Sequence, residues 1–312
     1  MTRRKILAAM DGSRQALEGV RYALGTLDLP EVKIVLFSVM SKVPEFFYDL
    51  GREPLFRRQI VEVRSWEKAV RDSFEKGMAE IRSMLNERNI PQSAIESEIR
   101  ERKEGVARDI IREAGNGYDA VLVGRSGLSK FKDIILGSIA QKLLSGMTDT
   151  SLWVIGGRPE LGKILLALDE SEGSMRAVDH VAAMLNRSIS QITLFHAIRG
   201  LSIFESTHEY PLSELDQEKS RIEAGKEMIE PVFKESVRRL TLSGFDRARI
   251  RTKIVTDASS RAGAIIEEAR KGEYGTIVVG RRGLSKVQEF FMGRVSNKVV
   301  QAAKTQAVWV VN

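Results

Sequence analysis

VGRSGLSK, at Val123–Lys130, returns 156 residues later as VGRRGLSK, at Val279–Lys286. A second segment returns at nearly the same distance, because KILAAMDGS begins at Lys5 and KILLALDES begins at Lys163. Offsets this constant indicate an internal duplication. The period is too long for a solenoid repeat, so each copy is expected to be a complete domain.

The join between the copies is predicted at the turn-rich stretch GGRP, Gly156–Pro159. The chain has 312 residues, which favours two domains over one, and its 43% apolar and 29% charged residues are typical of a soluble globular protein. We therefore predict one domain over residues 1–157 and a second over residues 158–312.

Each copy alternates short apolar runs with helical patterns, which predicts a parallel sheet with helices on both faces. Strands are expected at Lys5–Met10, Val32–Val39, Ile95–Arg100, Asp119–Gly124 and Leu152–Ile155, and at Lys163–Leu168, Gln191–Ile198, Arg249–Val255, Thr276–Gly280 and Val308–Val311. A longer helix lies between the second and third strands of each copy, and Pro231 is expected to kink or start the second one. Right-handed crossovers make each sheet doubly wound, and such sheets bind ligands beyond the carboxyl ends of their strands.

Composition narrows the classes of function. The formal net charge is +7, but basic and acidic residues alternate along the chain, so a solvated surface is favoured over nucleic-acid binding. The absence of cysteine excludes a disulfide scaffold and a thiolate nucleophile. No apolar run is long enough for a signal peptide or a membrane span, and we expect a cytoplasmic protein.

A glycine-rich loop follows the fourth strand of the first copy: Gly124 and Gly127 are followed, after nine residues, by Gly137 and Ser138. Glycines let the backbone approach a ligand closely, and a helix that starts near Ser138 directs free N–H groups and the positive end of its dipole at the loop. These features predict a phosphate site. A purely structural turn is the alternative, because turns also require glycine.

This motif resembles that of the universal stress protein family, whose ATP-binding members also carry an aspartate at the end of the first strand, as in AMDGS. The resemblance covers nearly the whole chain and implies a Rossmann-like, five-stranded parallel sheet in each domain. It implies that Asp11 and Val39 line the part of the site that holds adenosine. The loop and phosphate residues that it implies are Val123, Gly124, Arg125, Gly127, Gly137, Ser138 and Ile139. Asp11 has a second interpretation, as the N-cap of the following helix.

The second copy matches the same pattern with one important difference. Its implied site residues are Asp169, Gly280, Arg281, Gly283, Gly293, Arg294, Val295 and Ser296. Arg294 stands where the family has serine or threonine. It would either obstruct the phosphate pocket or bind phosphate as a bidentate cation. Because Ala197 also replaces the larger Val39, we expect unequal sites, with the first binding ATP more tightly.

The function that the resemblance implies is an adenine-nucleotide-binding stress-response module that acts as a sensor or regulator. ATP is the expected ligand, with ADP or AMP as alternatives and Mg²⁺ on the phosphates. A slow ATPase or nucleotidyl transferase, and a scaffold that binds no nucleotide, remain open. No general base is evident, so an enzyme is disfavoured, and His180, His196 and His208 lack metal-ligand spacing and are read as structural or incidental.

The last strand of each copy is short and apolar, and the two contain Trp153 and Trp309. Edge strands need cover, so we expect these strands to pair and the halves to form an internal pseudo-dimer. A homodimer and a regulatory protein partner are further expectations. The aromatic-rich segment Pro44–Phe56 is either a packing element or a lid or interface. Finally, Gly137→Val is expected to weaken nucleotide binding far more than folding.

Overall fold

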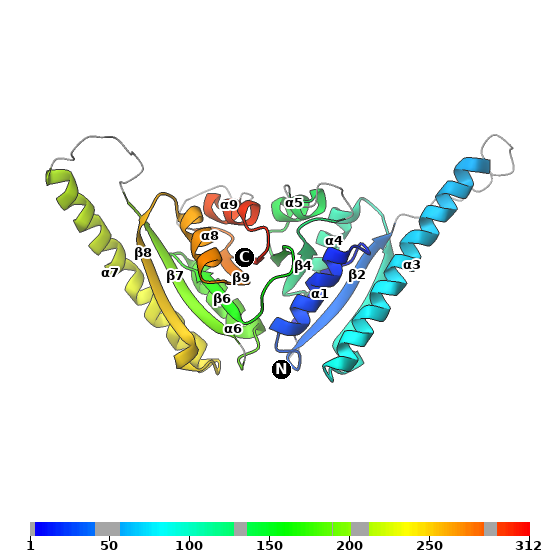
Figure 1. Ribbon diagram of the computed structural model, residues 1–312, viewed down its shortest axis with the longest axis horizontal. Coiled ribbons are helices and arrows are strands. Elements are labelled where there is room, and N and C mark those ends of the chain that lie inside the picture. The colour runs from blue at the N-terminus through cyan, green and yellow to red at the C-terminus, as the bar shows by residue number, and fades with distance from the viewer. Residues whose placement is uncertain (1–3, 41–56, 128–135, 189, 201–211, 284–291) are drawn as a thin grey trace.

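The computed structural model describes residues 4–40, 57–127, 136–188, 190–200, 212–283 and 292–312. The segment Pro44–Phe56 and His208 lie outside the described residues. All the described strands belong to one ten-stranded sheet with the order β3-β2-β1-β4-β5-β10-β9-β6-β7-β8. Figure 1 shows the two halves side by side, with the long helices α3 and α7 at opposite ends of the molecule.

The first domain contributes five strands, which pair in parallel in the order β3-β2-β1-β4-β5. They are β1 (Arg4–Ala9), β2 (Val32–Met40), β3 (Ile95–Glu101), β4 (Ala120–Gly124) and β5 (Ser151–Ile155). The helices are α1 (Arg14–Thr26), α3 (Arg57–Glu87), α4 (Val106–Ala114) and α5 (Ser138–Gly146), with a 3₁₀ turn η2 (Gln92–Ala94). The chain order reverses between β1 and β4, which is where a doubly wound sheet opens a ligand crevice.

The second domain repeats this plan. Its strands are β6 (Lys163–Ala167), β7 (Gln191–Arg199), β8 (Ile250–Ala258), β9 (Thr276–Gly280) and β10 (Ala307–Val311). Its helices are α6 (Glu172–Met184), α7 (Leu212–Leu242), α8 (Arg261–Lys271) and α9 (Arg294–Ala302), with a 3₁₀ turn η3 (Arg247–Arg249). The predicted α/β fold, with a parallel sheet in each half, is confirmed.

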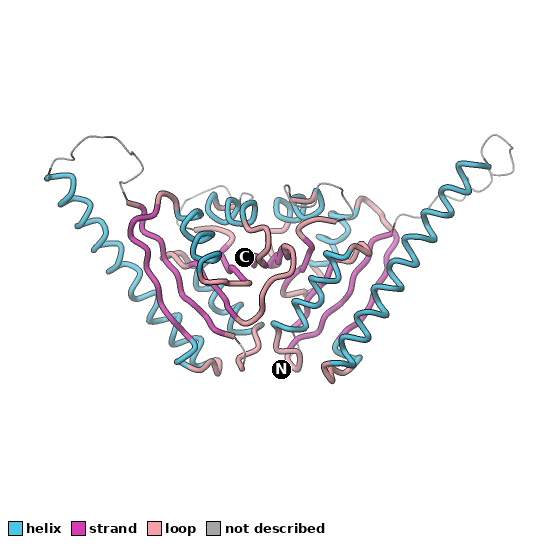
Figure 2. The backbone as a smooth tube through the Cα atoms, viewed as in Figure 1, coloured by secondary structure: helices cyan, strands magenta, loops and turns pink. Residues whose placement is uncertain are grey.

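Alternating strand residues divide the core between the two faces of the sheet. In β1, Ile6 and Ala8 pack with α1 and α3 on one face, while Leu7 packs with α4 and α5 on the other. The second domain follows the same rule, and Figure 2 shows its helices arranged about the strands as in the first. Fully buried apolar runs of this kind are expected when helices cover both faces of a sheet.

Pro231 lies inside α7, so the expectation that it might start this helix is wrong. Proline removes one backbone hydrogen bond and ordinarily interrupts a helix. Here Ile229, Phe233 and Leu240 on either side of it are buried in the core. Burial of this apolar face offsets the lost hydrogen bond and keeps the helix continuous.

The two domains meet where β5 and β10 pair in antiparallel register, as expected for these strands. Trp153 lies opposite Trp309, and their rings stack with centroids 3.8 Å apart and planes 2° from parallel. Both side chains are fully buried. The Nε1–H of Trp153 donates to Nε2 of His180, 3.1 Å away, on helix α6 of the other domain. The centre of the seam is therefore an apolar core, and this hydrogen bond is one of the specific polar contacts that join the two domains.

His180 provides a test of this seam. Burial, assisted by Arg4 and partly opposed by Asp119, lowers the pKa of His180 to about 4. The unfolded chain therefore takes up the proton first, and the contribution of His180 to stability is lost as pH falls from about 6.5 toward 4. His180→Gln keeps an acceptor for Trp153 but does not titrate. We predict that acidification lowers its free energy of unfolding by on the order of 1–3 kcal/mol less than it lowers that of the unmodified protein.

Urea unfolding followed by tryptophan fluorescence at pH 7 and pH 4.5 measures the effect for both proteins. Carboxylates titrate in the same range, so the informative quantity is the difference between the two pH dependences. Identical pH dependences would show that His180 is not held neutral at the seam.

Candidate functional site

A cavity of about 220 Å³ opens at the carboxyl ends of β1, β2 and β4 in the first domain. The starts of α4 and α5 close its other sides. Of the residues implied by the family resemblance, those that line it are Asp11, Val39, Val123, Gly124, Gly127, Gly137, Ser138 and Ile139. The residues named from the sequence are thus eight of the seventeen that line this cavity.

Asp11 is not the N-cap of α1, so that interpretation is wrong. Ser13 is the N-cap, and its hydroxyl accepts a hydrogen bond from the Ala16 backbone N–H at 3.2 Å. Asp11 precedes it and accepts from the Ser13 N–H at 2.9 Å, which fixes one carboxylate oxygen. A Cβ added to Gly127 would lie 2.6 Å from the other oxygen, Oδ2. Glycine therefore lets the loop pass close beside the carboxylate.

The glycine loop is held by main-chain hydrogen bonds. The Gly137 N–H donates to the Arg125 carbonyl at 2.8 Å, and the Arg125 N–H donates to the Ile155 carbonyl at 2.8 Å. Gly137 is the N-cap of α5 and provides no side chain to its first turn, so N–H groups there remain free for a ligand. A Cβ on Gly137 would lie 3.1 Å from the Arg125 carbonyl. Gly137→Val would therefore also disturb the loop itself, and the expectation that it weakens nucleotide binding far more than folding stays a prediction.

Arg125 and Arg281, which the resemblance implied as site residues, do not line the two cavities. Each lies in a glycine loop, but each guanidinium leaves its own domain. Arg125 donates to carbonyls at the end of α9, and Arg281 donates to Leu144 at the end of α5. Only the backbones of these two residues belong to the loops of their own sites.

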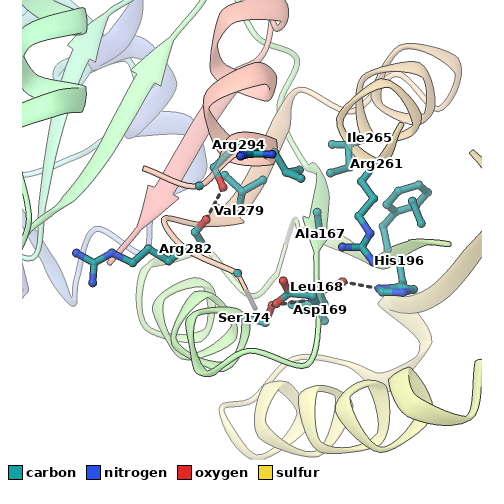
Figure 3. A pocket seen from close by; sticks show the side chains of 17 residues that line it. Ala167, Leu168, Asp169, Ser174, His196, Arg261, Ile265, Val279, Arg282 and Arg294 are labelled. Carbon is teal, nitrogen blue, oxygen red and sulfur yellow. Dashed lines mark hydrogen bonds between the residues drawn. The ribbon is translucent and has the colours of Figure 1, made fainter. Parts of the chain in front are cut away.

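The second domain has an equivalent cavity of about 250 Å³, which Figure 3 shows from close by. Of the residues implied by the resemblance, those that line it are Asp169, Gly280, Gly283, Gly293, Arg294, Val295 and Ser296. Asp169 is held more firmly than Asp11, because its Oδ1 accepts from the Ser171 and Ser174 hydroxyls, the latter at 2.7 Å. Ala16 occupies the position of Ser174 in the first domain and provides no such bond.

Ser296 has a structural role that the sequence did not predict. Its hydroxyl donates to the Gly280 carbonyl at 2.7 Å and so ties the start of α9 to the glycine loop. The hydroxyl proton is therefore already used, and it is not available to a phosphate without breaking this bond. Arg294 is exposed at the first position of α9 and has no ion-pair or hydrogen-bond partner among the described residues.

Two charged side chains of the second cavity, Arg261 and Arg282, were missed in the sequence, and His196, read there as structural or incidental, also lines it. Arg261 is the first residue of α8 and takes the place of Val106, the first residue of α4. Figure 3 shows it reaching toward His196, whose Nδ1 is 2.8 Å from the Leu168 carbonyl, while Arg282 points away. Crossover helices start at the carboxyl edge of a parallel sheet. That rule was the available signal for Arg261, which is the first residue of such a helix.

The two cavities differ sharply in charge. Among the described lining residues, Asp11 is the only ionisable side chain of the first cavity. The second contains Asp169 and His196 together with Arg261 and Arg294, and a third lining arginine, Arg282, directs its guanidinium away. The second cavity is therefore the better environment for an anion. This charge distribution favours the opposite ranking from the one expected from the motifs alone.

The described residues contain no cluster of three or more His, Cys, Asp or Glu side chains that could hold a metal ion. None of the described helices is long and apolar enough to cross a membrane.

Comparison with known proteins gives one consistent result. The model of the universal stress protein family matches residues 2–149 and again residues 160–312. A universal stress protein from Archaeoglobus fulgidus DSM 4304 is similar in structure, with a TM-score of 0.58, 16% identity, and coverage of 100% of this chain and 99% of that chain. A putative universal stress protein from Pseudomonas aeruginosa UCBPP-PA14 has a TM-score of 0.56, 14% identity, and coverage of 99% and 93%.

A third solved structure is a universal stress protein in complex with cAMP, which has 20% identity, covers 48% of this chain and 96% of that chain, and has a TM-score of 0.32. No curated protein matches the chain. The two family matches together span nearly the whole sequence, in agreement with the duplicated fold and the paired cavities. The chain therefore belongs to the universal stress protein family and consists of two tandem copies of the family domain.

Proposed function

We propose that this chain binds adenine nucleotides in both cavities and acts as a sensor or regulator whose state depends on their occupancy. The observation that carries the proposal is the recurrence, in both domains, of one arrangement. An apolar cavity at the strand ends opens onto a glycine loop, and the free N–H groups of a helix start beside that loop. This combination suits a ligand with a flat apolar part and a phosphate tail.

The size of the cavities supports a definite placement of the ligand. Volumes of 220 and 250 Å³ fall below the roughly 300–1,000 Å³ typical of sites that enclose a drug-sized ligand. We therefore place only the base and sugar inside, against Phe37 and Val39 or against Phe195 and Ala197. The phosphates lie at the open mouth, on the loop and the helix start. ATP is the proposed ligand, with ADP and AMP as shorter alternatives and Mg²⁺ accompanying the phosphates.

The charges support a ranking of the two sites. Arg261 and Arg294 are exposed and unpaired among the described residues, so their guanidinium groups need not break an existing bond to meet a phosphate. A guanidinium–phosphate pair is charge-assisted and bidentate. We propose that the second site binds ATP more tightly than the first, and that Arg294 acts as a clamp and not as an obstruction.

The seam supports a further part of the proposal. Antiparallel pairing of β5 with β10 gives the two sites a twofold-like relation within one chain. The loops after α1 and α6 also exchange backbone bonds, from the Asp28 N–H to Met184 and from the Asn186 N–H to Thr26, at 3.0 and 2.9 Å. We therefore propose that the domains work as an internal pseudo-dimer that presents both sites to a regulatory protein partner.

A first test uses Ser138→Asp. A carboxylate at the first position of α5 interacts favourably with the helix dipole, by about 0.3–1 kcal/mol, so the melting temperature should stay level or rise. The same charge repels phosphate, so we predict at least about a tenfold loss of ATP affinity at the first site. Calorimetric titration and thermal melting measure the two effects, and Ser145→Asp at the far end of α5 is the control. Undiminished ATP binding by Ser138→Asp would show that phosphate does not bind at the start of α5.

A second test converts the charged second cavity into the first. Arg261→Val and Arg294→Ser introduce the residues found at the matching positions of the first domain. We predict that each lowers ATP affinity at the second site about tenfold or more, and that together they flatten its salt dependence. ATP titrations at 50 and 300 mM salt measure this. Val106→Arg, which places the matching arginine in the first cavity, should raise ATP affinity at the first site. Tighter ATP binding by Arg294→Ser would show that the arginine obstructs the site.

A further inference from the structure

We propose that Arg125, although it lies in the glycine loop of the first domain, is a positioning residue for the phosphate site of the second domain. The inference rests on the proposed nucleotide function of that site. Its basis is a side chain that crosses the seam and holds the far end of α9, whose near end forms the second phosphate cradle.

The contacts of Arg125 are unusually complete. The residue is only 3% exposed. Its Nη1 donates to the Val300 carbonyl and, at 3.1 Å, to the Ala303 carbonyl, while Nη2 donates to Gln301 at 2.7 Å. The last carbonyls of a helix lack intrahelical partners and carry the negative end of its dipole. A guanidinium with several donors in a fixed plane therefore satisfies the end of α9 and fixes its direction.

Helix α9 connects this contact to the second site. It is nine residues long, from Arg294 to Ala302, which corresponds to a rigid rod of roughly 13 Å. Its first residues, Arg294 and Val295, line the second cavity beside the N-cap Gly293. A shift or tilt at the Ala303 end therefore moves the N–H groups that face the ligand. A preorganised anion site binds less tightly when its donor groups are displaced from their positions.

The first site does not depend on the same side chain. The Arg125 backbone is bonded to Ile155 and Gly137 within its own domain, both at 2.8 Å. These bonds use only main-chain atoms, so they survive replacement of the side chain. The backbone of Arg125 thus serves one site while its guanidinium serves the other, and a substitution can separate the two roles.

Arg281 is the matched residue of the second domain and provides the control. It is also 3% exposed, but it makes one such bond, from Nη2 to the Leu144 carbonyl at 3.0 Å. Its Nε and Nη1 have no hydrogen-bond partner among the described residues. Buried donors without partners cost free energy, so removing the Arg281 guanidinium loses less favourable interaction energy than removing that of Arg125. Figure 1 shows α5 and α9 next to each other across the seam, where Gln301 donates to Gln141 at 3.0 Å.

The test compares Arg125→Met with Arg281→Met in the full-length chain. Val39→Trp fills the first cavity and Ala197→Trp fills the second, so calorimetric titration with ATP reports one site at a time. We expect Arg125→Met to weaken ATP binding at the second site about tenfold and to leave the first site within about twofold. Arg281→Met should change either site by less than about threefold. Arg125→Lys, which keeps a donor, should restore part of the loss.

Each outcome decides the matter. Equal losses at both sites, or an equal loss at the second site with Arg281→Met, would indicate general loosening and overturn the proposal. Undiminished binding at the second site in Arg125→Met would overturn it as well. If Arg125→Met does not fold, as judged by circular dichroism, Arg125→Lys carries the test, and second-site affinity equal to that of the unmodified protein would overturn the proposal. Absence of ATP binding by the unmodified chain would instead refute the nucleotide function on which this inference rests.

Discussion

The antiparallel pairing of β5 with β10 is the constraint on which the rest of the molecule depends. Each domain alone would end its sheet in an exposed apolar strand, which is prone to pair with other chains. Pairing the two edges buries Trp153 against Trp309 and turns two sheets into one. It also brings the ends of α5 and α9 within reach of the opposite glycine loops, which places Arg125 and Arg281 where they are.

Within this common frame the two copies differ in chemistry while keeping their geometry. Both retain an aspartate at the end of the first strand and glycine wherever the loop passes the carboxylate or the helix start. The side chains around these fixed points differ, since Arg261 stands in place of Val106 and Ser174 in place of Ala16. The first cavity is nearly uncharged apart from Asp11, and the second is strongly basic. Duplication therefore allowed one backbone arrangement to offer two different electrostatic environments.

Much of this could be predicted from the sequence, because the features concerned are local or periodic. The repeat, the alternation of strands and helices, and the glycine spacing gave the fold and the positions of both cavities. The contacts of the Arg125 side chain could not be predicted. Its backbone belongs to the glycine loop of one domain, but its long side chain ends in the other domain. The bond made by Ser296 could not be predicted for a similar reason, since only the structure shows the Gly280 carbonyl to which its hydroxyl donates. Pro231 shows that core packing can override a helix-breaking residue.

We propose that both glycine loops hold the phosphates of an adenine nucleotide whose base lies in the cavity behind them. A crystal structure of the chain grown with ATP is the decisive measurement. Phosphate oxygens are expected about 2.7–3.2 Å from backbone nitrogens at the starts of α5 and α9. The adenine is expected against Phe37 in the first site and against Phe195 in the second. Nucleotide bound elsewhere on the protein, or bound with its phosphates directed away from both loops, would refute this assignment of the two sites.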